Sequence, residues 1–165
     1  MPKEPDLTPA SFAVLLVMQR CLPLIFAPDT AAAPLPVQGQ QLTADDRRIM
    51  GRGTEGTTIG YPVNGHDVFF ERAAMGASVW FVNADFRDAL QLLEDTLKRT
   101  FKGKELSAHD VPAPSGARTK TREYVIVPTG SRRAAVLRVT AGLSGAPATD
   151  QMFVARVFQH EQMAS

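Results

Sequence analysis

The sequence predicts a single α+β domain in which one long amphipathic helix packs on an antiparallel sheet of about five strands. The length of 165 residues is that of one ordinary domain with one core. With 44% hydrophobic and 21% charged residues, the composition is typical of a globular chain and not of a disordered one. The expected order of elements is helix, short helix, two strands, long helix and three strands. It contains no repeat, so we expect residues 1–165 to form one domain.

The N-terminal part, residues 1–41, is expected to be an apolar helix followed by a connector. Thr8-Pro9 is a good helix start, because the hydroxyl can cap the helix and proline suits its first position. Residues 12–18 are apolar around the whole circumference, so the helix should lie between layers or against a partner. Pro23 should end it near residue 22. The Pro- and Ala-rich stretch up to residue 41 should lack regular structure.

The same apolar run is expected neither to span a membrane nor to be a signal peptide. Gln19-Arg20 and Pro23 interrupt it, and the acidic Glu4 offsets Lys3 in the preceding segment. We therefore expect a cytoplasmic protein, with export to the periplasm from a longer precursor as the alternative.

Residues 42–160 are expected to form the sheet and helix core. Thr43 and Asp46 suit the start of a short helix that ends at about Met50. Residues 67–72 and 78–83 are rich in Val, Phe and Trp and predict a hairpin.

The long helix, at about 86–102, has the clearest pattern in the chain. Its apolar side chains recur at helical spacing and define one stripe: Phe86, Leu90, Leu93, Leu97 and Phe101. Its polar side chains, Glu94 and Lys98 among them, are expected to face solvent.

The segment 103–121 is polar and contains three Pro and Gly residues after Gly103, which indicates a long loop, either mobile or functional. Three further strands are expected at 122–127, 134–140 and 152–159, and residues 161–165 should form a frayed tail.

Charge argues against nucleic acid as the partner. Eighteen basic residues nearly cancel 17 acidic ones, for a formal net charge of +1. Residues 111–165 are mildly basic, with seven basic side chains against three acidic ones. That excess is spread over several elements, so we expect no nucleic-acid binding.

Side chains that could support catalysis or bind a metal are few. Cys21 is the one cysteine, so neither a disulfide within the chain nor a cysteine-rich zinc site is possible, and on an apolar helix it should be buried and inert. His66, His109 and His160 are never three or four residues apart, so we expect no metal site. His109-Asp110 is the first place to look for a general base.

Two glycine-containing segments match parts of phosphate-binding motifs without their context. Gly51-Arg-Gly-Thr-Glu-Gly56 has the spacing of a dinucleotide-binding turn, but a polar helix precedes it and no helix follows. Lys102-Gly103-Lys104 lacks the earlier glycine and the following Ser or Thr of a phosphate-binding loop, and fits a helix C-terminus. We expect no cofactor.

Strand alternation places one mixed set of side chains on the sheet face away from the long helix: Val136, Arg138, Val154, Arg156 and Phe158. This face needs a cover, which is either the N-terminal helix or another chain. The leading hypothesis is a non-enzymatic interaction or accessory protein that binds a partner protein, or a second copy of itself, through this face and the N-terminal segment. The alternative is a small-molecule sensor with segment 103–121 as a lid. An enzyme is the third class.

Overall fold

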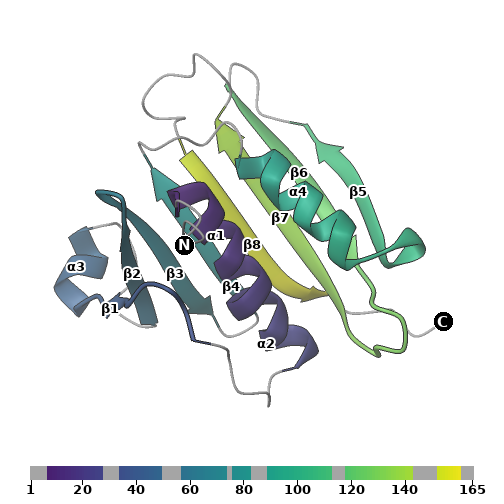
Figure 1. Cartoon of the computed structure of the whole chain (residues 1–165), viewed down its shortest axis with the longest axis horizontal. Helices are drawn as coiled ribbons and strands as arrows, with labels where there is room; N and C mark the ends of the chain where they lie inside the picture. Colours follow the sequence, from purple (N-terminus) through teal and green to yellow (C-terminus); the bar gives the residue numbers. More distant parts are fainter. Residues whose placement is uncertain are drawn as a thin grey trace, which may run out of the picture.

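A computed structural model of the chain describes residues 7–27, 34–49, 57–73, 76–82, 89–112, 118–142 and 152–160. One antiparallel sheet forms its centre (Figure 1). The helices in chain order are α1 (Pro9–Leu16), the π-helix η1 (Val17–Cys21), α2 (Leu22–Phe26), α3 (Ala44–Ile49), α4 (Ala89–Thr100) and the 3-10 helix η2 (Gly103–Glu105). The strands are β1 (Gln40–Gln41), β2 (Thr57–Val63), β3 (His66–Ala73), β4 (Gly76–Val82), β5 (Leu106–Val111), β6 (Thr119–Ile126), β7 (Ala134–Gly142) and β8 (Met152–His160).

The sheet has eight strands in the order β1-β2-β3-β4-β8-β7-β6-β5, and every neighbouring pair is antiparallel. The α+β class and the antiparallel sheet are therefore confirmed, whereas the number of about five strands is wrong, because β1, β2 and β5 add to it. The turn between β2 and β3 is Asn64-Gly65, and both residues have positive φ. This dipeptide suits a two-residue hairpin turn, whose twist matches that of the strands.

The N-terminal helix is longer than expected. Its start is as expected, with the Thr8 hydroxyl accepting a hydrogen bond from the Ser11 amide at 3.0 Å. It does not end near residue 22, because α1, η1 and α2 continue one another as far as Phe26. In the π-helical turn the Leu22 amide donates to the Val17 carbonyl, five residues back. This wider turn shifts the hydrogen-bond ladder just before Pro23, which has no N–H to donate.

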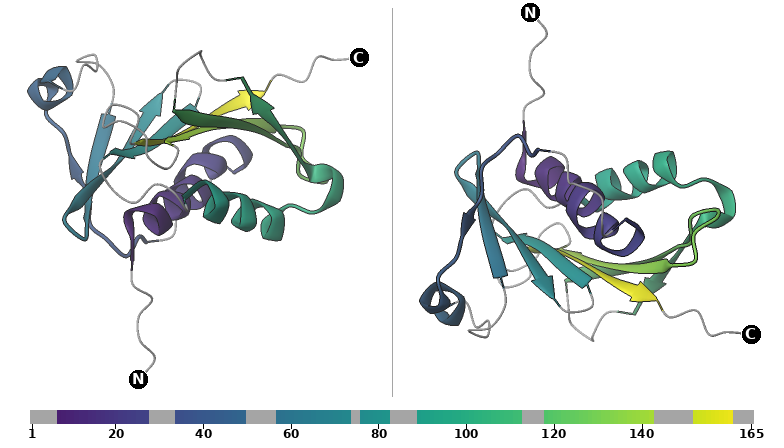
Figure 2. Two further views of the ribbon diagram at one scale, coloured as in Figure 1. Left: turned by 90° about the horizontal axis from the view of Figure 1, so that it is seen from above. Right: turned by 90° about the horizontal axis from the view of Figure 1, so that it is seen from below.

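Both long helices lie on the same face of the sheet, as the two views of Figure 2 show. α1 contacts α4, β3 and β4, while α2 contacts β7 and β8. Leu93 and Leu97 of α4 are fully buried in the core, as expected, and Leu90 is partly buried against it. The N-terminal helix therefore does not cover the opposite face, which was one of the two covers considered above.

The helix Pro9–Phe26 is long and apolar enough to cross a membrane by length and composition alone, with a mean hydropathy of 1.6 over 18 residues. In this fold 56% of it is buried. A core helix of a globular protein has the same length and composition, so the absence of a membrane span stays a prediction.

Two segments expected to be irregular contain strands. Gln40 and Gln41 form β1 at one edge of the sheet. Segment 103–121 is not one long loop: it begins with η2, continues as β5 along the other edge, and enters β6 at Thr119. The expectation was wrong because apolar and polar residues alternate only weakly in β5. As an edge strand it has one neighbouring strand, most of its side chains are exposed, and its sequence is almost as polar as that of a loop.

Candidate functional site

The face of the sheet opposite α1, α2 and α4 is called the open face here. Three aligned rows of side chains run across its strands, because directly paired residues of antiparallel neighbours point the same way. The middle row, called the charged row, crosses six strands: Glu71, Ser78, Arg156, Arg138, Glu123 and His109. The row on one side of it contains Phe158, Val136 and Val125, and the row on the other side contains Trp80 and Val154 followed by Thr140 and Thr121.

Glu123 forms ion pairs with both of its neighbours in the charged row, Arg138 and His109. Its Oε2 atom accepts from Arg138 Nε at 3.0 Å and from Nη2 at 2.7 Å. His109 Nε2 lies 3.3 Å from the other carboxylate oxygen, Oε1. A guanidinium that donates twice to a carboxylate is held in one orientation, so Arg138 is fixed on the sheet and its charge is balanced.

Arg156 differs from Arg138, although the two are directly paired on β8 and β7. Its side chain is exposed. Within the part of the chain that the structure describes, its guanidinium has neither an ion-pair nor a hydrogen-bond partner. Because Glu123 balances Arg138, the charge of Arg156 is the one left without a counter-ion among the described residues of these two strands.

Apolar groups lie beside these arginines. Phe158 is 37% exposed, and among the described residues it is the large hydrophobic side chain that is most open to solvent on this face. It is paired with Val136, which is buried. On the other side of the charged row, Val154 and Met152 are half-buried. A shallow hollow of about 230 Å³ lies there between them and the arginines, lined by Arg138, Thr140, Met152, Val154 and Arg156.

The five residues predicted for partner binding thus share one face, and the structure brings them together in adjacent rows of β7 and β8. Strand alternation was sufficient to place them. Whether they bind a partner stays a prediction.

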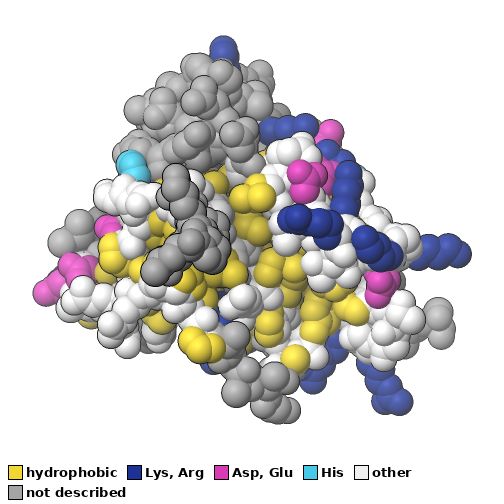
Figure 3. All heavy atoms as spheres, in the orientation of Figure 1, with side chains coloured by type: hydrophobic (Ala, Val, Ile, Leu, Met, Phe, Trp, Pro, Cys, Tyr) yellow, Lys and Arg dark blue, Asp and Glu magenta, His cyan; other side chains and the backbone are white. Residues whose placement is uncertain are grey.

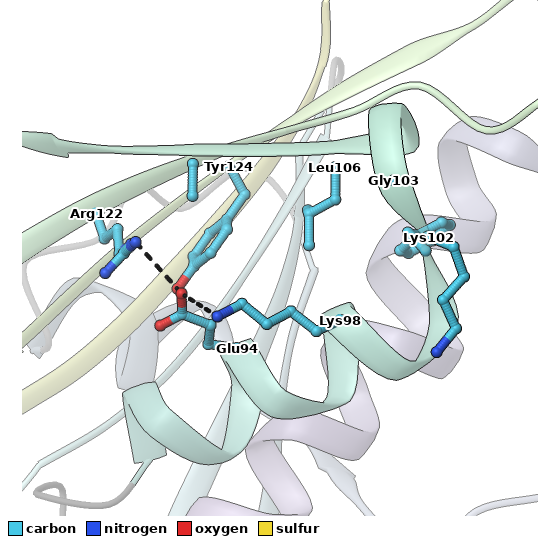
Figure 4. A pocket seen from close by; sticks show the side chains of 9 residues that line it. Glu94, Lys98, Lys102, Gly103, Leu106, Arg122 and Tyr124 are labelled. Carbon is cyan, nitrogen blue, oxygen red and sulfur yellow. Dashed lines mark ion pairs between the residues drawn. The ribbon is translucent and has the colours of Figure 1, made fainter.

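A second charged cluster lies on the helix side of the sheet, between α4 and the edge strand β5. Glu94, expected to face solvent, has a side chain that is 8% exposed. Its Oε1 atom is 3.3 Å from Arg122 Nη2 and 3.4 Å from Lys98 Nζ, and the two cations approach it from opposite sides (Figure 4). The expectation was wrong because β5 and β6 extend the sheet beneath the flank of α4, beyond the apolar stripe.

Tyr124 of β6 lies beneath this carboxylate. Its ring is fully buried, and its hydroxyl points toward Glu94 (Figure 4) without meeting the geometry of a hydrogen bond. Burial, and then the negative charge of Glu94, raise the pKa of Tyr124 well above its usual range. The Arg122 guanidinium lies 5.9 Å from the centre of the ring, and its buried Nε atom also lacks a hydrogen-bond partner.

These groups line a pocket of about 340 Å³, here called the α4–β5 pocket: Glu94, Lys98, Phe101, Lys102, Gly103, Leu106, Ala108, Arg122 and Tyr124. Lys and Arg side chains gather on this side of the molecule, whereas apolar side chains lie over α1 and α2 (Figure 3). The pocket combines three cations, one buried carboxylate and an apolar floor. No motif in the sequence marks it, because its residues come from α4, η2, β5 and β6.

The other residues considered in the sequence as catalytic or ligand-binding candidates do not form one site. His109 and Asp110 point to opposite faces of β5, so His109 contacts Glu123 and Asp110 lies 3.9 Å from Arg122. Cys21 is buried, and burial raises the pKa of its thiol far above the usual range. Gly103 has φ of 58° just after α4, which fits a helix C-terminus.

Other candidates lie apart from both clusters. The segment 51–56 and the side chain of His160 are outside the described residues, and His66 is exposed at the β2–β3 turn. Within the described ranges, no group of three or more His, Cys, Asp or Glu side chains could hold a metal ion.

Comparison of the chain with protein-family models, with curated proteins and with solved structures gives no match. Any function must therefore be inferred from the two clusters themselves.

Proposed function

We propose that this chain is a non-enzymatic interaction or accessory protein that binds a partner protein through the open face. The single observation that carries the proposal is the exposed Arg156 guanidinium, which has no partner among the described residues and lies opposite Arg138 and beside the exposed Phe158. Arginine and aromatic side chains are enriched at protein interfaces, where the planar fork binds carboxylates and the apolar groups lose water.

Charge and shape indicate the chemistry of the partner. Of the two arginines, Glu123 balances Arg138, so the pair leaves one positive charge for an incoming group. The apolar groups on both sides of the charged row, Phe158 on one and Val154 with Met152 on the other, can contact apolar side chains. The segment that fits best therefore presents an Asp or Glu flanked by apolar residues. The N-terminal helix, which lies in the core on the other side, is not part of this surface.

The alternative function is a small-molecule sensor with residues 103–121 as a lid. The described part of this segment does not favour a lid. Residues 106–111 are hydrogen-bonded to β6 as an edge strand, which is not a loop free to close over a ligand. Cytoplasmic residence, like the absence of nucleic-acid binding, stays part of the proposal.

The test is the substitution Arg156→Glu, compared with the wild type in pull-downs from native host lysate. Captured proteins should be lost, because the new carboxylate repels an acidic partner. Thermal stability should stay the same or rise slightly, because the introduced carboxylate can pair with Arg138, a gain of roughly 0.2–1 kcal/mol. Arg99→Glu is the matched control, since Arg99 is an exposed arginine on α4, on the other side of the molecule.

Two results would count against the proposal. An identical set of captured proteins with Arg156→Glu and with wild type would show that the open face is not the binding surface. Loss of binding with the Arg99→Glu control would place the interface on the helix side instead. Light scattering of both variants separates a second copy of this chain from a different protein, since a homo-oligomer would dissociate with Arg156→Glu.

A further inference from the structure

We propose that the α4–β5 pocket binds a small organic anion, a carboxylate or phosphate monoester attached to a compact apolar body. This inference does not depend on the proposed function of the open face, since the pocket lies on the other side of the sheet. It rests on the charge of the pocket, on the polar atoms buried in it, and on its size.

The charge of the pocket favours an anion. Lys98, Lys102 and Arg122 line it together with one acid, Glu94, so its lining carries a surplus of two positive charges. Lys98 is 63% exposed and shares a single carboxylate oxygen with Arg122, which leaves donors of both cations available. Lys102 is exposed and has no ion-pair partner among the described residues. Cations close to a partly enclosed apolar wall attract an anion more strongly than cations in open solvent.

Two buried polar atoms in the pocket wall have hydrogen-bonding capacity left for a ligand. The Tyr124 hydroxyl is fully buried and is directed toward the Glu94 carboxylate, with which it interacts without reaching the geometry of a full hydrogen bond (Figure 4). Arg122 Nε is buried without a hydrogen-bond partner as well, and Oδ1 of Asp110, with which it forms an ion pair, is 3.9 Å away. Buried donors of this kind are nearly always satisfied in proteins, so two of them in the wall of one pocket are consistent with a bound polar group there. A ligand oxygen could accept from both.

The size and the walls of the pocket limit the rest of the ligand. A volume of about 340 Å³ is at the small end of ligand sites. Phe101, Leu106 and Ala108 supply apolar surface on the side of η2 and β5. A body of about the size of one aromatic ring fits that volume, with its anionic group toward the lysines.

The experiment titrates the full chain with benzoate and with phenyl phosphate, using calorimetry or amide shifts in NMR spectra. Benzyl alcohol tests the apolar body without the charge, and inorganic phosphate tests the charge without the body. Saturable binding of at least one aromatic anion below roughly 10 mM is expected, even at the modest efficiency per atom of drug-sized ligands. The neutral alcohol should bind at least about tenfold more weakly. The two anionic probes distinguish a carboxylate ligand from a phosphate ester.

Variants locate the binding. Tyr124→Phe removes the hydroxyl and keeps the ring, and Lys102→Gln removes an exposed charge, so both should bind the preferred anion several-fold more weakly with melting temperatures close to wild type. Lys104→Gln is the control, because Lys104 is an exposed lysine in η2 that does not line the pocket. Absence of saturable binding by both aromatic anions would overturn the proposal. So would equal affinities of wild type, Tyr124→Phe and Lys102→Gln.

Discussion

Replacing Arg122 by methionine should destabilise the protein more than replacing the acid that it pairs with. The Glu94 side chain is 8% exposed, and Arg122 and Lys98 both lie within 3.4 Å of its Oε1 atom. Breaking a buried pair by removing one partner costs about 3–5 kcal/mol, because an uncompensated charge stays buried. Lys98 remains as a partner, so we expect the lower end, about 3 kcal/mol.

A smaller cost is expected for Glu94→Gln. Arg122 is 27% exposed, so without Glu94 its guanidinium can still be hydrated. We expect a loss of about 1 kcal/mol, the net value of one ordinary hydrogen bond, because the Gln amide keeps an acceptor oxygen at the same place. The double substitution should be less destabilised than Arg122→Met alone, because it leaves no buried charge.

Urea and thermal denaturation of the three variants measure these differences. For a chain of 165 residues, 3 kcal/mol corresponds to a fall in Tm of about 6–12 °C. Two results would refute the proposed coupling. One is a smaller cost for Arg122→Met than for Glu94→Gln. The other is a double variant that loses the sum of the two single effects, since additivity would mean that the groups do not interact.

Three further outcomes are expected. Leu93→Ala should lose about 2–5 kcal/mol by transfer and cavity effects, and more than Leu92→Ala, because Leu93 is fully buried and Leu92 is not; equal melting curves for both would contradict the packing of α4. The backbone amides of Thr129 and Lys102 donate hydrogen bonds to Glu105 and lower the pKa of its carboxyl group below the usual 4.5. The ionised carboxylate therefore stabilises the fold above pH 4.5, and this stabilisation is lost as the pH falls through the lowered pKa. Glu105→Gln should therefore be less stable than wild type at pH 7, with the difference shrinking in acid denaturation below pH 4.5; a constant difference would argue against it. Cys21 should react with a thiol reagent only after unfolding, and rapid labelling in native buffer would show that η1 opens or is misplaced.

Local sequence patterns predicted the helices and strands that have one apolar face and one polar face. The stripe of Leu93 and Leu97 identified α4, and strand alternation placed Arg138 and Arg156 on one face. β2 was missed although Asn64-Gly65, the strongest short hairpin signal, marks its end. β5 was missed because four of its six residues are exposed, so its pattern does not distinguish it from a loop.

The candidate sites depend on contacts that no local pattern encodes. The burial of Glu94 results from β5 and β6 lying beneath one flank of α4, which depends on the order of strands. A helical wheel places Glu94 at the edge of the polar side of α4, where the sequence is compatible with a buried side chain and with an exposed one. The absence of a partner for Arg156 among the described residues likewise depends on the register that sets it opposite Arg138.

The position of β8 affects how the chain can fold. β8 follows all the other strands in sequence, yet it lies between β4 and β7 in the middle of the sheet. Its register with β4 pairs Val79 with Ala155, which are 155 − 79 = 76 residues apart in the sequence. The two strands also approach each other closely at Gly76 of β4, where a Cβ atom would collide with the Val157 carbonyl oxygen. The hairpins on either side can form from local contacts, but the two halves of the sheet can join only once residues 152–160 have been synthesised. Until then both β4 and β7 present unpaired edges, so newly made chains should be most prone to aggregation just before β8 is available.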